Sequence, residues 1–554
     1  MDNQRIFLWI ALALIFWLNY QAWMTDYGPA PATPASQTGT AADPEAGLQA
    51  PAADALPDLP GAEQPAPEQP VTEVTGPGPA GKLITVRTDV LDARISLSGG
   101  DLVSASLPTY PVTKDHPDVP VQLLSLQPSR LFVFRTGLRA RDDGATTGPD
   151  TPFRAEQEQY ELAPGADVLE IPLVAELGNG VTVTKTWRFE RGSFRVELDQ
   201  AVSNQGSQPW TGASYLQIRR LHVPKERSFT DVDSYSFIGP VIYNGDKYEK
   251  LDVGDLVGEP VQFTTASGWV ASIQHHFLAA AIPGDGQAAY SATARPDGLS
   301  LLSGVRSPVQ VEAGGSHLFT DRLFVGPKLQ DQLEETAPKL RLTVDYGWLT
   351  IISQPLFWLL SKIHDVVGNW GWAIIIMTVL IKLVFYKLSE TSGKSMAKMR
   401  KLQPRMKALQ ERYADDRQKL SQAMMDLYKR EKVNPAAGCL PILVQMPVFL
   451  ALYWVLLESV EMRQAPFMLW INDLSAKDPY FILPLLMGVT MWIQQKLNPA
   501  PPDPVQAKVM QVLPVIFTVF FAFFPAGLVL YWFVNNLLSI LQQWRINRVV
   551  EKMG

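Results

Sequence analysis

The chain has 554 residues, enough for about three or four domains. Its 48 lysines and arginines against 55 aspartates and glutamates give a formal net charge of −7, which excludes the strongly basic character of a nucleic-acid-binding protein. With one cysteine, the chain can form neither an internal disulfide nor a cysteine-based zinc site. A mean hydropathy of +0.01, with 15 tryptophans and 24 phenylalanines, indicates membrane spans joined to a large water-facing part.

The first 81 residues predict an anchor followed by a tether. Residues 6–24 form an apolar run long enough to cross a bilayer, at about 20 residues per span, so we expect residues 1–27 to be an uncleaved membrane anchor. A cleaved signal peptide is the alternative, but its apolar region is usually about 7 to 15 residues long. Residues 28–81 are acidic and rich in proline and alanine, contain no lysine or arginine, and predict a disordered tether. Because Arg5 precedes the anchor, we expect the N-terminus in the cytoplasm and the tether outside.

Residues 82–340 predict one all-β domain on the outer side of the membrane. The strand candidates show β-branched alternation and are bounded by glycine turns: strands at 83–90, 93–97, 181–189 and 194–198, turns at 99–100, 178–180 and 314–315. This pattern favours an antiparallel β-sandwich. His275 and His276 are adjacent, and on a strand their side chains would point to opposite faces, so we expect no two-imidazole site there.

The C-terminal part predicts one interfacial helix and five spans. Residues 346–360 are apolar and aromatic but too short to span, so we expect an interfacial amphipathic helix within residues 341–365. The apolar block at 509–541 is too long for one crossing, and Pro525 and Gly527 predict its division into two. The predicted core, residues 366–554, then has spans at 370–388, 439–460, 480–497, 509–524 and 527–541.

Together with the anchor, these spans make a polytopic α-helical membrane protein with six spans and a five-helix core. An even number of crossings returns the C-terminal cations Arg545, Arg548 and Lys552 to the cytoplasm, as the positive-inside rule requires. A single tilted helix in place of the last two spans would leave these cations outside.

The connection between the first two core spans predicts a cytoplasmic helical hairpin at residues 388–433. Residues 387–432 carry 13 cations and 6 anions, a net charge of +7. Apolar residues recur three and four apart on both sides of Asp415 and Asp416, as expected of two facing helices. Two interpretations are open. The hairpin is a solvated linker with a self-packed seam, or Met399, Met406 and Met424 form an adaptable surface, ringed by cations, that meets apolar clients, the ribosome or anionic headgroups.

Five short motifs resemble the YidC/Oxa/Alb family of membrane insertases. They are residues 398–404, 434–441, 445–447, 463–467 and 524–528, which read KMRKLQP, NPAAGCLP, QMP, RQAPF and FPAGL. The anchor, tether and β domain resemble the Gram-negative YidC arrangement, so the resemblance extends over essentially the whole chain. It implies an inner-membrane insertase that places nascent membrane proteins in the bilayer, alone or beside the Sec translocon. The family's hydrophilic groove is open to the cytoplasm and to lipid and closed on the outer side. The resemblance implies no covalent chemistry, so we expect no catalytic residue, no metal and no cofactor.

Polar side chains within the predicted spans are the candidates for the groove lining: Thr378, Lys382, Gln445, Thr490, Gln494, Asn535, Asn536 and Ser539. Lys382 stands out because an ionisable residue inside a span is a functional candidate. The alternative is that Lys382, close to Lys387, extends to the cytoplasmic headgroups. The resemblance implies a groove cation, usually arginine, at this position. Lysine keeps that charge but lacks the bidentate fork of arginine.

The resemblance also implies a slide of apolar side chains that contact client segments, formed by Phe449, Met487, Phe520, Tyr531 and Trp532. Ordinary packing between helices is the alternative for each of them. Two other classes of function stay open. A secondary transporter would use Lys382, but it should show paired repeats, which this sequence lacks. A periplasmic carbohydrate-binding protein is the other, because the family's β domain resembles the galactose mutarotase fold, but a fold alone does not establish that activity.

Overall fold

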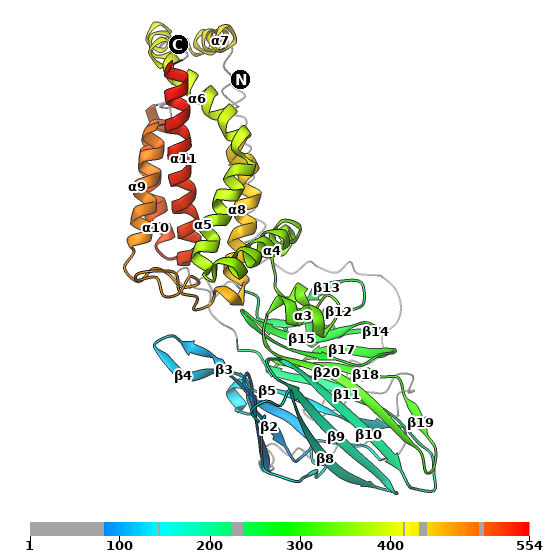
Figure 1. The fold of residues 1–554 in the computed structure, drawn as a ribbon. Coiled ribbons are helices and arrows are strands. Elements are labelled where there is room, and N and C mark those ends of the chain that lie inside the picture. The colour runs from blue at the N-terminus through cyan, green and yellow to red at the C-terminus, as the bar shows by residue number, and fades with distance from the viewer. Residues whose placement is uncertain are drawn as a thin grey trace, which may run out of the picture.

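The computed structural model describes residues 82–141, 145–223, 236–413, 416–431, 440–497 and 504–552. A β domain lies at one end of the molecule, a bundle of helices is joined to it, and a helical hairpin extends from the far end of the bundle (Figure 1). The predicted anchor and tether, residues 1–81, lie outside the described residues, as does most of the motif at 434–441.

The β domain contains three sheets. The largest has nine strands in the order β13-β12-β15-β16-β20-β10-β9-β8-β6; the second has the order β14-β17-β18-β11-β19, with β5 also paired to β11; the third has the order β4-β3-β2-β1-β7. The strand bounds are β1 Leu83–Arg87, β2 Asp92–Ser96, β3 Asp101–Thr113, β4 His116–Leu124, β5 Phe132–Ala140, β6 Arg154–Ala155, β7 Gln159–Glu161, β8 Val168–Gly178, β9 Val181–Glu190, β10 Arg195–Asn204, β11 Trp210–Leu221, β12 Gly239–Tyr243, β13 Tyr248–Lys250, β14 Val261–Thr265, β15 Trp269–Gln274, β16 Phe277–Ile282, β17 Ala288–Ala294, β18 Leu299–Arg306, β19 Val309–Val311 and β20 Ser316–Pro327.

Alternating burial explains why these segments are strands. Every second residue of β9 is buried, from Val181 to Phe189, and β9 pairs with β10 along its whole length. Gly178, Asn179 and Gly180 all have positive φ, which allows the tight reversal from β8 into β9. The predicted antiparallel arrangement is confirmed with one exception, because β1 and β7 are paired in parallel.

A buried lysine joins the three sheets. Lys185 on β9 donates from Nζ to the carbonyl of Gly99 (2.6 Å), to the carbonyl of Thr136 (2.8 Å) and to the Thr136 hydroxyl (3.0 Å). The Asp101 carboxylate lies 3.9 Å away. Burial lowers the pKa of Lys185 to about 8. Because Gly99 precedes β3 and Thr136 lies on β5, the ammonium group fixes the sheets relative to one another.

The premise of the expectation for His275 and His276, that both lie on a strand, is wrong. Both residues lie in the turn between β15 and β16 rather than on a strand, and their rings stack with centroids 3.7 Å apart. A turn does not impose the alternation on which the expectation relied. His275 Nε2 is hydrogen-bonded to the carbonyl of Leu457 (3.0 Å), so the pair faces the helical bundle.

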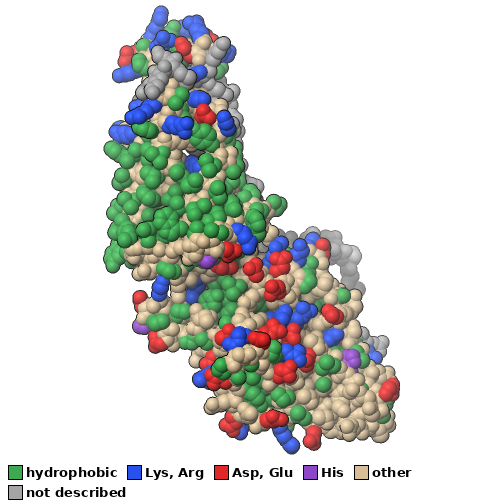
Figure 2. Space-filling model, in the orientation of Figure 1, with side chains coloured by type: hydrophobic (Ala, Val, Ile, Leu, Met, Phe, Trp, Pro, Cys, Tyr) green, Lys and Arg blue, Asp and Glu red, His purple; other side chains and the backbone are tan. Residues whose placement is uncertain are grey.

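The remaining elements are helical. Their bounds are η1 Pro128–Arg130, α2 Asp255–Gly258, α3 Gln330–Thr336, η3 Leu340–Thr343, η4 Gly347–Leu349, α4 Thr350–Val367, α5 Trp370–Val384, α6 Tyr386–Arg412, α7 Arg417–Arg430, α8 Leu440–Glu458, η6 Val460–Met462, α9 Ile482–Leu497, α10 Pro504–Phe521 and α11 Ala526–Lys552. The bundle is formed by α5, α8, α9, α10 and α11, while α4 crosses between the bundle and the β domain (Figure 1). Hydrophobic side chains cover the visible face of the bundle, and lysines and arginines gather at its hairpin end (Figure 2).

The helices overlap the predicted segments but differ at their ends. The chain reverses around Pro525 as predicted, whereas α11 continues to Lys552 instead of ending at residue 541. The span predicted at 370–388 ends at Val384, where α5 and α6 meet at a bend of 67°. The predicted interfacial helix exists as α4 and extends to Val367, with Ile351 and Val366 strongly exposed.

Judged by length and hydropathy, no single helix in the described part of the chain qualifies alone as a membrane span. The pair of α5 and α6 qualifies together, but it is bent; Leu443–Glu458 and Lys508–Phe521 are shorter apolar helices. The count of six spans and the interfacial position of α4 stay predictions.

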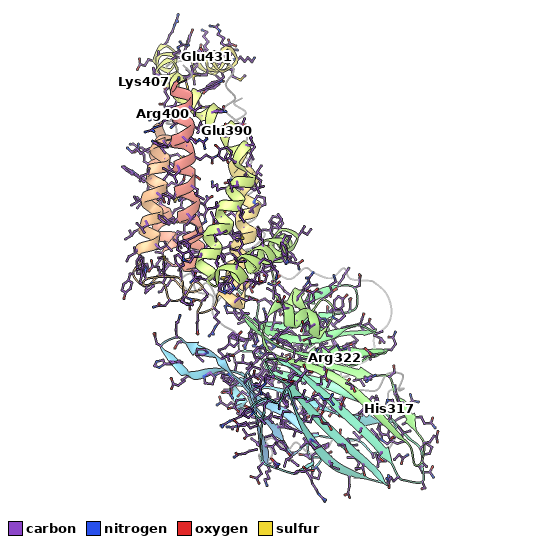
Figure 3. The ribbon with its side chains drawn as sticks, in the orientation of Figure 1. His317, Arg322, Glu390, Arg400, Lys407 and Glu431 are labelled. Atoms are coloured by element: carbon purple, nitrogen blue, oxygen red, sulfur yellow. The ribbon has the colours of Figure 1, made fainter. Side chains whose placement is uncertain are left out.

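The residues predicted to form the hairpin lie in α6 and α7, which pack against each other. Leu402 and Met406 are buried between the two helices, and Met399, Met424 and Leu427 pack against them. Arg405 and Glu431 form an exposed ion pair of 2.7 Å. Arg400 and Lys407 lie near the far end of the hairpin, away from the β domain (Figure 3). Asp415, in the break between the helices, lies outside the described residues.

Candidate functional site

The predicted groove cation points into the bundle. Lys382 lies on α5, two residues before the helix ends, and its Nζ donates to Ser539 Oγ on α11 at 2.8 Å. The Ser539 hydroxyl in turn donates to the carbonyl of Asn535, one turn earlier on α11 (2.7 Å). This geometry turns the ammonium group toward a neighbouring helix rather than outward to headgroups. It brings Lys382, Ser539 and Asn535 together, three of the residues predicted for the groove.

The other predicted polar residues differ in how far their hydrogen-bonding capacity is used. Thr378 and Thr490 are buried, and each hydroxyl donates to a carbonyl of its own helix at 2.7 Å. Gln445 on α8 and Gln494 on α9 are half-buried. Asn536 is buried, and its Nδ2 has no hydrogen-bond partner among the described residues. An amide donor of this kind suits an acceptor that comes from outside the bundle.

The predicted slide forms part of a continuous aromatic cluster. Phe449 on α8 lies 6.2 Å from Tyr531 and 4.8 Å from Trp532 on α11, measured between ring centroids. Trp532 continues to Phe521 on α10 (5.5 Å), which also contacts Phe520 (5.5 Å). The sequence-based prediction missed Phe521 and Phe524, although the run of phenylalanines before Pro525 is visible in the sequence.

Members of the predicted slide differ in exposure. Met487 is fully buried and Tyr531 is 5% exposed, whereas Phe520 is 36% exposed. Phe449 and Trp532 are half-buried. The rings of Phe449, Phe520 and Trp532 are therefore accessible at the surface of the bundle, whereas Met487 and Tyr531 are packed between helices.

An outer loop, residues 463–480, covers the ends of the helices that face the β domain. Asp473 Oδ1 accepts hydrogen bonds from the backbone amides of Gln464 (3.0 Å) and Ser475 (2.9 Å). Asn369 Nδ2, at the start of α5, donates to the carbonyl of Phe467 (3.1 Å). The amide of Gly527, at the start of α11, donates to the carbonyl of Leu474 (2.9 Å). The loop is therefore fixed to α5 and α11 at this end of the bundle.

The hairpin methionines are arranged as the self-packed seam rather than as an open surface. Met406 is 5% exposed, and Met399 and Met424 are partly buried against the same cluster. The interpretation as a methionine surface open to clients is not supported for these three side chains, because they already fill the contact between α6 and α7. Met425, which is 58% exposed, faces outward instead.

The β domain is attached to the bundle by contacts that sequence reasoning missed. Arg463 donates to the carbonyl of Pro111 (2.7 Å), in the hairpin of β3 and β4, and Lys114 near the tip of that hairpin donates to the carbonyls of Gln464 (3.1 Å) and Asn472. Ser236 donates to Glu458 (3.1 Å) at the end of α8. No motif marks these residues, because their partners are more than 200 positions away in the chain.

Comparison with known proteins gives a consistent result over the whole chain. The family described as "YidC periplasmic domain" matches residues 83–359, and the family described as "60Kd inner membrane protein" matches residues 362–553. The chain is 52% identical to the membrane protein insertase YidC of Thioalkalivibrio sulfidiphilus over 567 residues and 50% identical to that of Nitrosococcus oceani over 557 residues, with 100% of each chain covered in both cases. Among solved structures, an active YidC insertase with its first transmembrane domain resolved is 20% identical, with a TM-score of 0.38, over 84% of this chain and 92% of that one.

Proposed function

Because the chain belongs to the YidC family of membrane protein insertases, it inserts membrane proteins into the bacterial inner membrane, and we propose that it does so through a polar groove lined by Lys382. In this proposal the polar tail of a client passes along Lys382, Ser539 and Asn535, while the client's apolar segment leaves over Phe449, Phe520 and Trp532. The contact of 2.8 Å between Lys382 and Ser539 is the observation that carries the proposal.

The energetic argument rests on the cost of polar groups in hydrocarbon. Each unsatisfied backbone amide or carbonyl of a translocating tail costs several kcal/mol in the bilayer core. Hydroxyls and amides on α5, α8, α9 and α11 offer partners that lower this cost, and Asn536 has an unused donor among the described residues. The ammonium of Lys382 adds attraction for acidic residues in the tail, which is strong where water is scarce.

The proposed topology follows from the charges and the position of the outer loop. The hairpin of α6 and α7 lies in the cytoplasm, and both termini lie there too, so that clients enter the groove from the hairpin side. The outer loop keeps the opposite end closed toward the periplasm. Lysines and arginines at the hairpin end of the bundle support this orientation (Figure 2).

The proposed partners are nascent membrane proteins, the Sec translocon, the ribosome and membrane lipids. The net positive charge of the hairpin favours weak encounter with the ribosome and with anionic headgroups, an electrostatic attraction that weakens with salt. The lysines and arginines of the hairpin and the exposed Met425 are the features available for these contacts, since Met399, Met406 and Met424 pack in the seam.

A substitution series at Lys382 tests the proposal. Lys382→Arg keeps the charge, Lys382→Gln keeps only polarity, and Lys382→Leu removes both. We expect insertion of a client with an acidic tail to be retained with arginine, to fall several-fold with glutamine and to fall most with leucine. Clients with neutral tails should be affected less. Equal losses for acidic and neutral tails, or no loss with leucine, would show that Lys382 is not the attracting charge. Lys387→Gln, five residues after Lys382 and beyond the bend between α5 and α6, is the matched control and should leave insertion unchanged.

A further inference from the structure

A half-buried glutamate with one fully shielded carboxylate oxygen lies between the β domain and the helical bundle. Glu461 on η6, directly after α8, projects into a cavity of about 400 Å³ lined also by Tyr110, Phe194, Gln332 and Arg463. The backbone amides of Gln330 and of Glu461 itself donate to the carboxylate, while Oε2 is shielded from water and has no hydrogen-bond partner among the described residues. A carboxylate in this position is poorly compensated when it is ionised.

The charged groups around Glu461 do not neutralise it. Asp331 on α3 adds a second negative charge, whereas the Arg463 guanidinium is directed to the carbonyls of Pro111 and Val112 at 2.7 and 3.1 Å. Tyr110 on β3 and Tyr346 also face Glu461, and burial raises the pKa of both phenols, which therefore remain neutral. Burial, with a contribution from Asp331, raises the pKa of the Glu461 carboxyl from its ordinary 4.5 to about 7.

From this arrangement we propose that Glu461 makes the docking of the β domain on the bundle dependent on periplasmic pH, with the docked form favoured when the carboxyl is protonated. The interface brings together residues of β3, α3 and η6, so separation of the two parts would expose Glu461 to water. A protonated carboxyl tolerates burial, whereas a carboxylate favours the separated form. In this proposal, pH controls the docking of the β domain, a property separate from the insertion activity. The proposal does not depend on the groove lined by Lys382.

The sign of the effect follows from linkage. In the separated form Glu461 ionises near pH 4.5, and in the docked form it ionises near pH 7. Docking is therefore strongest below pH 4.5, weakens as the pH rises from 4.5 to 7, and stays weak above pH 7. The difference between pKa values of 4.5 and about 7 corresponds to a total fall of about 300-fold in the docking constant, of which about 100-fold lies between pH 4.5 and 7.5.

Amide hydrogen exchange on the full chain in lipid nanodiscs, corrected for intrinsic exchange rates and run from pH 4.5 to 7.5, tests this proposal. We expect the protection factors of α3 and η6 to fall about 100-fold across this range, while those of the hairpin of β9 and β10 stay constant. Glu461→Gln should keep the low-pH protection at every pH. A flat profile in the unaltered chain, or the same fall in Glu461→Gln, would overturn the proposal.

Three further variants separate Glu461 from its neighbours. Asp331→Asn should move the transition to lower pH by removing the like charge, and an unmoved transition would contradict the proposal even if Glu461→Gln fails to fold. Glu334→Gln, an exposed carboxylate on the same helix, is the matched control and should behave as the unaltered chain. Imidazole side chains also change charge in this pH range, and His275 lies at the same interface. His275→Gln therefore measures how much of the pH-dependent change in protection comes from this imidazole. Loss of the transition in His275→Gln would assign the effect to the imidazole and overturn the proposal. The upper limit of pH 7.5 keeps buried Lys328, whose pKa burial lowers to about 8, largely protonated.

Discussion

At the scale of single residues, the molecule depends on side chains whose partners come from distant parts of the chain. Lys185 holds three sheets together, and Lys382 reaches from α5 to α11. Both are lysines inside apolar surroundings, yet Lys185 is enclosed by carbonyls, a hydroxyl and a carboxylate within hydrogen-bonding or ion-pairing distance. Lys382 has one hydroxyl partner and lies near the end of its helix. An ammonium group whose hydrogen bonds are all satisfied suits the structural role of Lys185. The ammonium group of Lys382 has fewer partners, which suits its proposed attraction for acidic residues of a client.

Gly371 illustrates how closely the outer loop packs. A Cβ at this position would lie 2.0 Å from the Phe467 ring and 2.8 Å from Phe467 Cβ, so rotation of the ring alone cannot relieve the clash. We expect Gly371→Ala to lower the stability of the bundle by about 1–3 kcal/mol through overpacking, measured by thermal unfolding in detergent. Gly258→Ala, on a helix with open space at the same position, is the control. An unchanged melting temperature in Gly371→Ala would show that the outer loop is not fixed against α5.

At the scale of elements, the seam of the hairpin gives a direct comparison between two methionines. Met406 is buried between α6 and α7, and Met425 is exposed. Met406→Ala should destabilise the hairpin by about 2 kcal/mol, the low end for a buried methionine because the seam is shallow. Faster amide exchange along α7 measures this loss, and Met425→Ala should leave exchange unchanged. Similar amide exchange rates along α7 in Met406→Ala and Met425→Ala would contradict the packing of Met406 between α6 and α7.

The local patterns account for most of the elements, and tertiary contacts explain the differences. Alternation in β9, apolar spacing in α6 and α7, and the reversal at Pro525 are all encoded within a few neighbouring residues. The assignment of Met406 to the seam depends on contacts between α6 and α7. Polar residues in spans identified Lys382 and Ser539 as candidates, but only the fold pairs them. Glu461 had no sequence signal, because its burial requires β3 and α3.

At the scale of the whole molecule, the proposed orientation predicts which face of the membrane each exposed residue occupies. Ala526, the natural choice for labelling at the reversal, is fully buried, so nearby Lys477 is the better probe. In a Cys439→Ser background, Lys477→Cys should react with an impermeant thiol reagent from outside. Lys407→Cys on the hairpin and Arg548→Cys near the C-terminus should react only after permeabilisation. Labelling of Arg548→Cys from outside would rule out the six-span arrangement.

The most direct test of the central claim is insertion by the purified chain alone in proteoliposomes. A small single-span client with a short acidic tail is added, and protection of the tail from external protease reports its translocation. The account predicts protected tail with the unaltered chain and with Lys382→Arg, and a several-fold smaller amount with Lys382→Leu reconstituted at the same density. Protection that is no greater than in empty liposomes, or that is equal for Lys382→Leu and the unaltered chain, would contradict a groove that carries clients past Lys382.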